Sequence, residues 1–427
     1  MFRFVHAADL HLGAAFRGIR TGSDEMADRL SMATYRALGR IVKLALDEKA
    51  AFVVFSGDLL NAADGNLRAW MELRRASERL ADAEIPTFFI RGNHDHLGGR
   101  LPPLTWPGAC TWFGADEGEP RRLEAGGGTV QVAGRSHSRQ AVAENLALGY
   151  PRPDPALFSV ALHHTNCGSN AEHASYAPCS LPDLRAIGYR YWALGHIHKR
   201  AILQEADPLV AYAGCPQGLN PKETGPRGCL LVTVHDDLSA AAEFRETDEV
   251  RWHMESLDIA GMAAVDDLEA AVAGLAERLR PEDADRSAIV RIRLTGRGCL
   301  DPVLRRPGAV PALLEATRMG SSAAGQVWAE SIEVATGPEV DLEAMATGDS
   351  FAGDFLRRAA ALPNDPAALA DLQGALEPLL AHKAFGDAMR ASGDAPDALW
   401  SDAHLAELLQ QAVAMGIDHL AAKEGAV

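Results

Sequence analysis

The first half of the chain repeats one pattern, in which a short apolar run is followed directly by Gly, Asp, Asn or His. Apolar runs of this length, rich in Val, Phe, Ile and Trp, are typical of strands buried in a sheet. Between some of them, residues 24–49 and 66–83 carry apolar side chains at every third or fourth position, which predicts amphipathic helices. The runs that precede polar clusters are residues 52–55, 87–90, 158–162 and 191–194.

Alternation of strand and helix predicts parallel β-α-β units. In sheets of this kind, functional side chains gather beyond the carboxyl ends of the strands, which is where the polar clusters stand. From about residue 126 to 248 the helical periodicity fades and strand patterns dominate, which predicts a second sheet packed on the first. The clearest strands of this segment are residues 130–132, 209–212 and 229–234.

The pattern changes again near Arg251. Helical periodicity over residues 265–279 is followed by strand patterns over 288–294 and 328–334, which predicts a small α+β domain. Beyond Gly337 the pattern is nearly all helical. The expected helices cover residues 351–361, 366–381 and 402–422.

We therefore predict three parts: an α/β domain of two mixed sheets flanked by helices (1–250), an α+β domain (251–340) and a helical region (341–427). The length agrees, because 427 residues exceed the usual size of a single domain. The composition, 47% hydrophobic and 23% charged, excludes collagen-like and disordered classes.

The formal net charge is −17, which opposes the basic character that many nucleic-acid-binding proteins use to contact phosphates. Bound metals would restore positive charge locally, and a partner subunit is a second source of it. The N-terminus shows no signal-peptide pattern, and no apolar run reaches the ~18 residues that a membrane span needs. We expect a cytoplasmic protein without membrane contact.

Two of the polar clusters offer an aspartate as a candidate metal ligand. Asp9 and His11 lie two residues apart at a strand end, so their side chains project to the same side, as two ligands of one metal must. A solvated Asp beside a packed His is the alternative for this motif alone. Asp58 follows Gly57 after a buried strand, and its two oxygens are able to bridge two cations. Its alternative is a helix N-cap.

The remaining clusters combine imidazole and amide groups. In Gly92-Asn93-His94-Asp95, Asn93 offers a neutral carbonyl ligand, while His94 is free to face a phosphoryl group as an acid. Asp95 is the candidate that orients His94. His196 and His198 again project to one side, and such imidazole pairs suit Mn, Fe or Zn.

The ordered set Asp-Xaa-His, Gly-Asp, Gly-Asn-His-Asp, His and Gly-His-Xaa-His resembles the calcineurin-like metallophosphoesterase superfamily across about the first 250 residues. Within it, residues 8–13 and 191–199 are similar to bacterial DNA repair exonucleases of the SbcD and YhaO type. Three further stretches resemble the YhaO type specifically: residues 162–166, 176–181 and 221–228.

The resemblance implies a metallophosphoesterase sandwich with two divalent metal ions, with Mn²⁺ expected and Fe or Zn as alternatives. It implies that the first metal is held by Asp9, His11, Asp58 and His198, and the second by Asp58, Asn93, His164 and His196. His94 and Asp95 would serve in catalysis. His163 and His164 both end one strand, and the resemblance favours His164 as the ligand.

The resemblance also implies DNA as substrate, residues 251–340 as a capping domain and residues 341–427 as a docking region for an SMC-like ATPase. A homodimer is left open. The chain itself carries no Gly-Xaa4-Gly-Lys-Ser/Thr loop for ATP.

Two departures from the pattern concern the site. Asn61 stands where these nucleases tend to carry His or Asp, and Cys215 and Leu219-Asn220 replace polar residues usual in the YhaO-like pattern. Asn61 supplies no charge and does not titrate. The alternatives are a phosphoesterase acting on a small molecule or phosphoprotein, since this fold serves many esters, and a scaffold without catalysis. Decayed ligand motifs would mark the scaffold, and the motifs here are intact.

Overall fold

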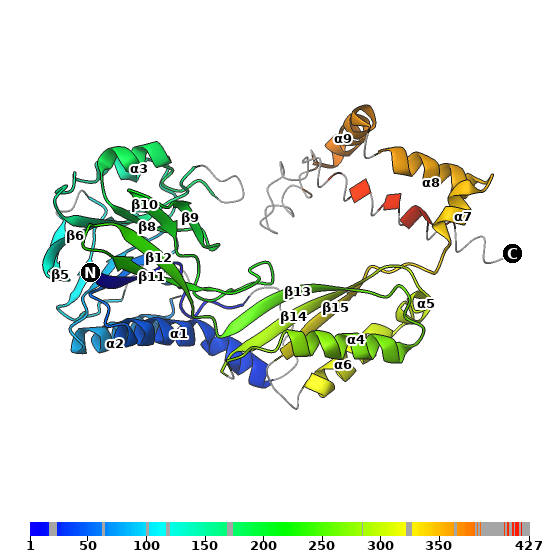
Figure 1. Ribbon diagram of the computed structural model, residues 1–427, viewed down its shortest axis with the longest axis horizontal. Coiled ribbons are helices and arrows are strands. Elements are labelled where there is room, and N and C mark those ends of the chain that lie inside the picture. The colour runs from blue at the N-terminus through cyan, green and yellow to red at the C-terminus, as the bar shows by residue number, and fades with distance from the viewer. Residues whose placement is uncertain are drawn as a thin grey trace. The chain divides into compact units, whose positions relative to one another are not determined.

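The first sheet of the computed structural model has six strands, of which four run parallel (Figure 1). The helices α1 (Asp24–Asp47) and α2 (Leu67–Asp82) pack on one face of it. In sheet order the strands are β12 (Ala240–Glu246), β11 (Gly228–Val234), β1 (Phe2–Ala7), β2 (Val53–Ser56), β3 (Thr87–Ile90) and β4 (Cys110–Trp112).

The second sheet also has six strands and is also mixed. The short helices η2 (Leu146–Gly149) and α3 (Leu181–Ile187) flank its outer face. In sheet order its strands are β5 (Arg121–Ala125), β6 (Gly128–Arg135), β7 (Phe158–His164), β8 (Tyr191–Gly195), β10 (Leu209–Tyr212) and β9 (Ala201–Gln204).

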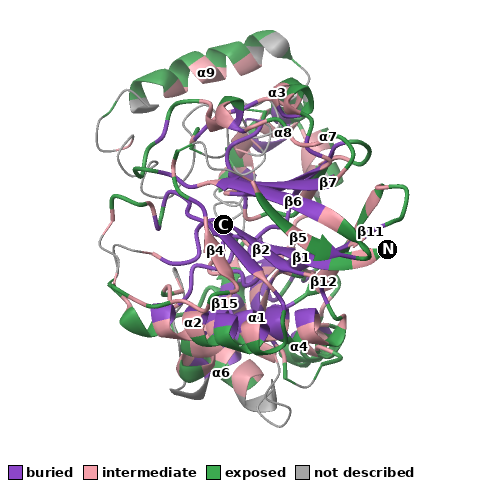
Figure 2. Ribbon diagram, turned by 90° about the vertical axis from the view of Figure 1, so that its left-hand side faces the viewer, coloured by how far each residue is buried: buried purple, intermediate pink, exposed green. Residues whose placement is uncertain are grey.

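The inner faces of the two sheets form one apolar layer, seen as buried strands in Figure 2. Phe4 of the first sheet stacks on Phe52 with ring centroids 4.7 Å apart and meets Tyr191 of the second sheet edge-on at 5.1 Å. Aromatic pairs in these geometries add to the free energy gained by burying their area. The predicted sandwich of two mixed sheets flanked by helices is therefore confirmed.

The structure describes most of the chain, in two compact units: 1–254, 279–290 and 324–330 form the first, and 255–278, 291–323 and 331–427 the second. The predicted boundaries at 250 and 340 stay a prediction. The described residues are 1–16, 24–61, 65–99, 102–116, 120–168, 174–283, 285–321, 327–362, 365–380, 382, 385, 405, 408–409, 412–413, 415–417 and 420.

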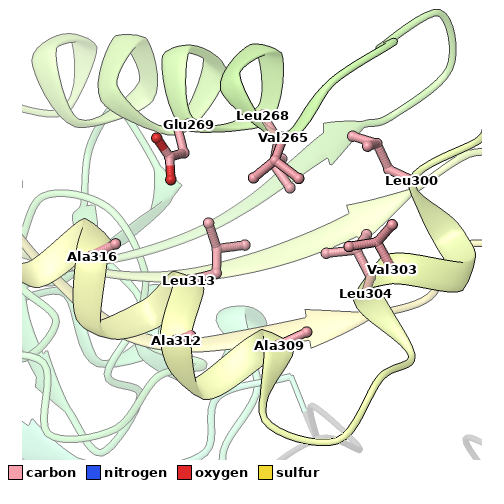
Figure 3. A pocket seen from close by; sticks show the side chains of 10 residues that line it. All are labelled: Val265, Leu268, Glu269, Leu300, Val303, Leu304, Ala309, Ala312, Leu313 and Ala316. Atoms are coloured by element: carbon pink, nitrogen blue, oxygen red, sulfur yellow. The ribbon is translucent and has the colours of Figure 1, made fainter.

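A third sheet has three strands in the order β13 (Val250–Asp258), β14 (Ser287–Thr295) and β15 (Val327–Val334). In the second unit, α4 (Val265–Arg278), α5 (Asp301–Leu304) and α6 (Ala309–Ser321) enclose a cleft of about 370 Å³ (Figure 3). Apolar side chains line it, together with Glu269.

The helical region expected after Gly337 is present. It contains α7 (Leu342–Thr347), α8 (Phe351–Ala361) and α9 (Pro366–Leu380). Most of the helix expected over residues 402–422 lies outside the described residues. None of the described helices is long and apolar enough to cross a membrane.

His6 of β1 gives the fold a sensitivity to acid. Its side chain is fully buried, with Nδ1 2.9 Å from the Tyr191 hydroxyl, and burial lowers its pKa from 6.5 to about 3. The unfolded chain therefore binds a proton below about pH 6.5 that the folded chain does not. Stability contributed by neutral His6 is complete above that pH and is lost as the pH falls toward 3.

The free energy of unfolding of the unmodified protein should fall when the pH is lowered from 7.5 to 5. We expect this decrease to be about 2 kcal/mol smaller in His6→Gln, because the substitution removes the titrating group. Urea unfolding of both proteins at the two pH values measures the difference. His235→Gln removes an exposed imidazole instead and serves as the control. Equal pH dependence of all three proteins would contradict the prediction.

Candidate metal centre

The polar clusters follow five strands whose carboxyl ends meet. They emerge after β1, β2, β3, β7 and β8, and backbone hydrogen bonds tie the first two loops together: Asp9 N donates to Gly57 O at 3.0 Å and His11 N to Asp58 O at 3.1 Å. The side chains concerned are Asp9, His11, Asp58, Asn93, His164, His196 and His198.

Several of these residues have a backbone conformation that L-amino acids rarely adopt. The φ angles are 52° at Asp9, 42° at His11, 51° at Asp58 and 100° at His196. Each such residue costs on the order of 1–3 kcal/mol, so the surrounding structure must hold it in place. Strain of this kind clusters at functional sites, and here the fold maintains it in three loops of one site.

Two glycines of the motifs are required by close packing. A Cβ at Gly92 would lie 2.2 Å from Asp58 Oδ1, and one at Gly195 would lie 2.0 Å from the Ser56 carbonyl oxygen. Both distances are far inside van der Waals contact. The glycines in Gly-Asn-His-Asp and Gly-His-Xaa-His therefore allow their loops to approach Asp58 and Ser56, respectively.

One group of ligands forms around His11. Its Nε2 lies 3.1 Å from Nε2 of His198 and 3.9 Å from Oδ2 of Asp58. Asp9, His11 and His198 present ligand atoms within 4.8 Å of one another. Three of the four residues expected at the first metal are therefore mutually close, and Asp58 adjoins them.

A second group forms around His164. Its Nε2 lies 3.4 Å from Asp58 Oδ2 and 3.0 Å from Asn93 Oδ1. His196 is placed at the edge of this group: its ring centroid is 5.3 Å from that of His164, while its Nε2 lies 2.9 Å from the Ala174 carbonyl oxygen. Asp58 is common to both groups, which is the placement that a bridging carboxylate needs.

The outer hydrogen bonds of three imidazoles direct their Nε2 lone pairs into the site. Each Nδ1 faces an oxygen that can only accept, so Nδ1 carries a hydrogen, and Nε2 offers a lone pair once the ring is neutral, as a metal ligand must be. The acceptors are Asn61 Oδ1 at 2.9 Å for His11, the Ser56 carbonyl at 2.9 Å for His164 and Glu223 Oε1 at 2.5 Å for His198.

Neutral His11 and His198 would thus face each other with two lone pairs 3.1 Å apart. This arrangement is repulsive unless a proton or a cation lies between them. Imidazole nitrogens, carboxylates and one amide oxygen suit Mn, Fe or Zn. The residues present therefore fit two divalent metal ions.

The close packing of buried acids and imidazoles in the site also shifts their pKa values. Burial opposes charge on His164, yet the Asp58 carboxylate beside it raises its pKa to about 9. Burial likewise acts to raise the pKa of Asp58, but the neighbouring imidazoles, His164 first, hold it well below its usual range. Burial raises the pKa of Asp9 to about 6. Asp58 is therefore the anion around which the site is organised.

His94 lies at the exposed side of the site. Its backbone N–H donates to Asp58 Oδ1 at 2.8 Å, and its ring meets the His11 ring edge-on with centroids 5.0 Å apart. Asp95 is fully buried, and its two oxygens accept backbone hydrogen bonds from Gly92 at 2.7 Å and Leu59 at 3.0 Å. Asp95 thus joins the loops after β2 and β3, and its catalytic role stays a prediction.

Alternation along β7 separates the two adjacent histidines. His164 points to Asp58, whereas His163 points to the outer face of the second sheet, where its Nδ1 lies 3.5 Å from the Tyr150 hydroxyl. His163 is also fully buried there, with its ring centroid 6.1 Å from that of Trp192. The structure thus brings His164 to the site and leaves His163 away from it.

Glu223 is a residue of the site that the sequence patterns did not single out. It accepts from His198 and, at 2.5 Å, from the Leu219 backbone N–H. Together with Cys215 and His198 it forms a further group of ligand atoms within 4.8 Å. Glu223 lies in the stretch 221–228 quoted for the resemblance, but no spacing relates it to His198, 25 residues away.

Residues 2–200 match the calcineurin-like phosphoesterase family. That part of the chain is similar to this superfamily. Residues 252–337 match the middle domain of the metallophosphoesterase YhaO. The phosphoesterase ligands Asp9 to His198 thus lie within the first match, and β14 and α4 to α6 lie within the second.

Among the relatives of the chain is the uncharacterized metallophosphoesterase YhaO of Bacillus subtilis strain 168, 35% identical over 258 residues. The alignment covers 60% of the chain and 63% of that relative, less than two thirds of its length. The DNA double-strand break repair protein Mre11 of Saccharolobus solfataricus is 25% identical over 248 residues. The alignment covers 56% of the chain and 62% of that relative. A dimetal phosphatase from Danio rerio is 12% identical at a TM-score of 0.33, and the match covers 57% of the chain and 98% of that structure.

Removing the acceptor on His198 tests the tautomer argument. We expect Glu223→Ala to weaken Mn²⁺ binding about 10-fold, because outer hydrogen bonds of this kind contribute 10- to 100-fold to metal affinity. Titration calorimetry of the metal-free protein measures the change. Glu243→Ala, an exposed carboxylate of β12, is the control, and an unchanged dissociation constant in folded Glu223→Ala would refute the role.

Proposed function

We propose that the protein is a metal-dependent phosphodiesterase that cleaves DNA in repair, as an exonuclease or endonuclease. The observation that carries the proposal is the pair of ligand groups sharing Asp58, with His94 exposed beside them. Relatives named as DNA double-strand break repair proteins support DNA as the substrate. Manganese is the proposed metal, with iron or zinc as alternatives.

Bound metals would polarise the phosphoryl oxygens and lower the pKa of a water molecule. The chain supplies the rest. Asp58 and Asn93 combine one negative and one neutral oxygen ligand, which leaves net positive charge for a phosphate. His94, an exposed residue, is proposed to protonate a leaving oxygen or to neutralise developing charge.

We further propose an SMC-like ATPase as partner, with the helical region 341–427 as its docking segment. The sequence has no phosphate-binding loop for ATP, so any dependence on ATP must come from such a partner. A homodimer is the other candidate assembly. A small-molecule or phosphoprotein phosphoesterase is the alternative function, and the net charge of −17 favours it.

The purified protein with Mn²⁺ is to be tested on linear duplex DNA, single-stranded DNA, a chromogenic phosphodiester and a phosphomonoester. The proposal expects cleavage of DNA and of the diester. Hydrolysis of the monoester alone would overturn the nuclease assignment in favour of the alternative.

His94→Ala is expected to lower kcat about 100-fold or more, since a positioned acid contributes 10²- to 10⁴-fold. Its Mn²⁺ content should match the unmodified protein, because the His94 ring is assigned no metal. Metal analysis and DNA cleavage rates measure both quantities, with exposed His235→Ala as the control. Full activity of His94→Ala would exclude its catalytic role.

A further inference from the structure

A pocket of about 330 Å³ adjoins the candidate metal centre in the first unit. His198 belongs to both, because its Nε2 faces His11 while the residue also lines the pocket. Four cationic residues line the same pocket: Lys199, Arg200, Lys222 and Arg227. We refer to it as the basic pocket.

The structure holds two of these cations in place. Arg227 donates from one terminal nitrogen to the His198 carbonyl oxygen at 2.7 Å and from the other to the Thr224 carbonyl oxygen at 3.1 Å. The Arg200 guanidinium lies over the Phe244 ring, 4.7 Å from its centroid. Guanidinium groups positioned in this way lose less conformational freedom on meeting an anion.

Gly214 forms part of the wall next to Arg200. Its φ is 77°, and a Cβ there would lie 2.8 Å from both the Arg200 nitrogen and the His198 carbonyl oxygen. The backbone of residues 198–200 therefore packs directly on the loop after β10. This contact joins the pocket wall to the ligand His198.

No acidic residue is among the described residues that line the basic pocket. The nearby Glu223 carboxylate is engaged on both oxygens, by His198 Nδ1 and by the Leu219 N–H. In a chain with 58 acidic and 41 basic residues, such a concentration of cations does not follow from composition. Its local potential attracts anions despite the net charge.

We propose that the basic pocket binds a second phosphate of the substrate, while the metal centre holds the phosphate that is cleaved. This inference rests on the proposed phosphodiesterase function and makes strands with at least two phosphates the preferred substrate. A shared wall at His198 allows one strand to reach both places. A free phosphate ion has the same chemistry, and the experiment separates the two sources.

The test compares a thymidine dinucleotide, which has one phosphodiester, with the trinucleotide, which has two. In the unmodified protein with Mn²⁺, the second phosphate is expected to lower KM about 10-fold. Arg200→Ala/Lys222→Ala should lose this gain while keeping KM for the dinucleotide. Both positions are exposed, and Arg227 is left intact because it holds the His198 loop.

The matched control is Arg121→Ala/Arg122→Ala, on β5 at the opposite edge of the second sheet from β9. It removes the same charge and should retain the gain. The inference would be overturned if the pocket variant kept the lower KM for the trinucleotide, or if the control variant lost it to the same extent. So would an equal rise of KM for both substrates, which would place the effect at the metal centre.

Fluorescence anisotropy of the labelled oligonucleotides on Mn²⁺-loaded His94→Ala protein, with and without the pocket or control substitutions, tests the pocket with little turnover. The trinucleotide should bind about 10-fold more tightly than the dinucleotide, and only the pocket variant should lose the difference. If neither substrate is cleaved, the proposed function fails, but the binding measurement still decides the inference about the pocket. Equal affinities, with inorganic phosphate displacing both, would show a free-phosphate site and refute it.

Discussion

Groups from three separate loops converge on the buried carboxylate of Asp58. His164 and His11 approach one oxygen at 3.4 and 3.9 Å, and the His94 backbone N–H occupies the other at 2.8 Å. A buried anion requires such partners, because an unpaired charge in the interior is costly. The positions of the surrounding imidazoles therefore depend on this one side chain.

The two-sheet sandwich brings the loops that carry these side chains together around Asp58. Its parallel strands deliver five loops to one edge, and the backbone bonds between the loops after β1 and β2 hold their strained residues. Glycines at 92 and 195 allow the backbone to reach within contact of Asp58 and Ser56. The site is thus a consequence of strand order and of close loop packing rather than of any one loop.

Charge is distributed unevenly over the molecule. The chain as a whole is strongly acidic, yet four cations gather beside His198 and no described acidic residue lines their pocket. Net charge governs long-range repulsion of a polyanion, whereas a local cluster governs where a phosphate rests once it arrives. The two observations are therefore compatible, and the second is more relevant to substrate placement.

The sequence by itself determined many of the strands and the residue types of the site. Residues 87–90 and 209–212 were predicted to the residue, because strand periodicity and flanking polar residues are local properties. The tertiary structure alone decided the partners across the site. Alternation on β7 sends His164 inward and His163 outward, Asn61 accepts from His11, and Glu223 accepts from His198. These pairings join loops that are distant in sequence, so only the path of the folded chain brings them together.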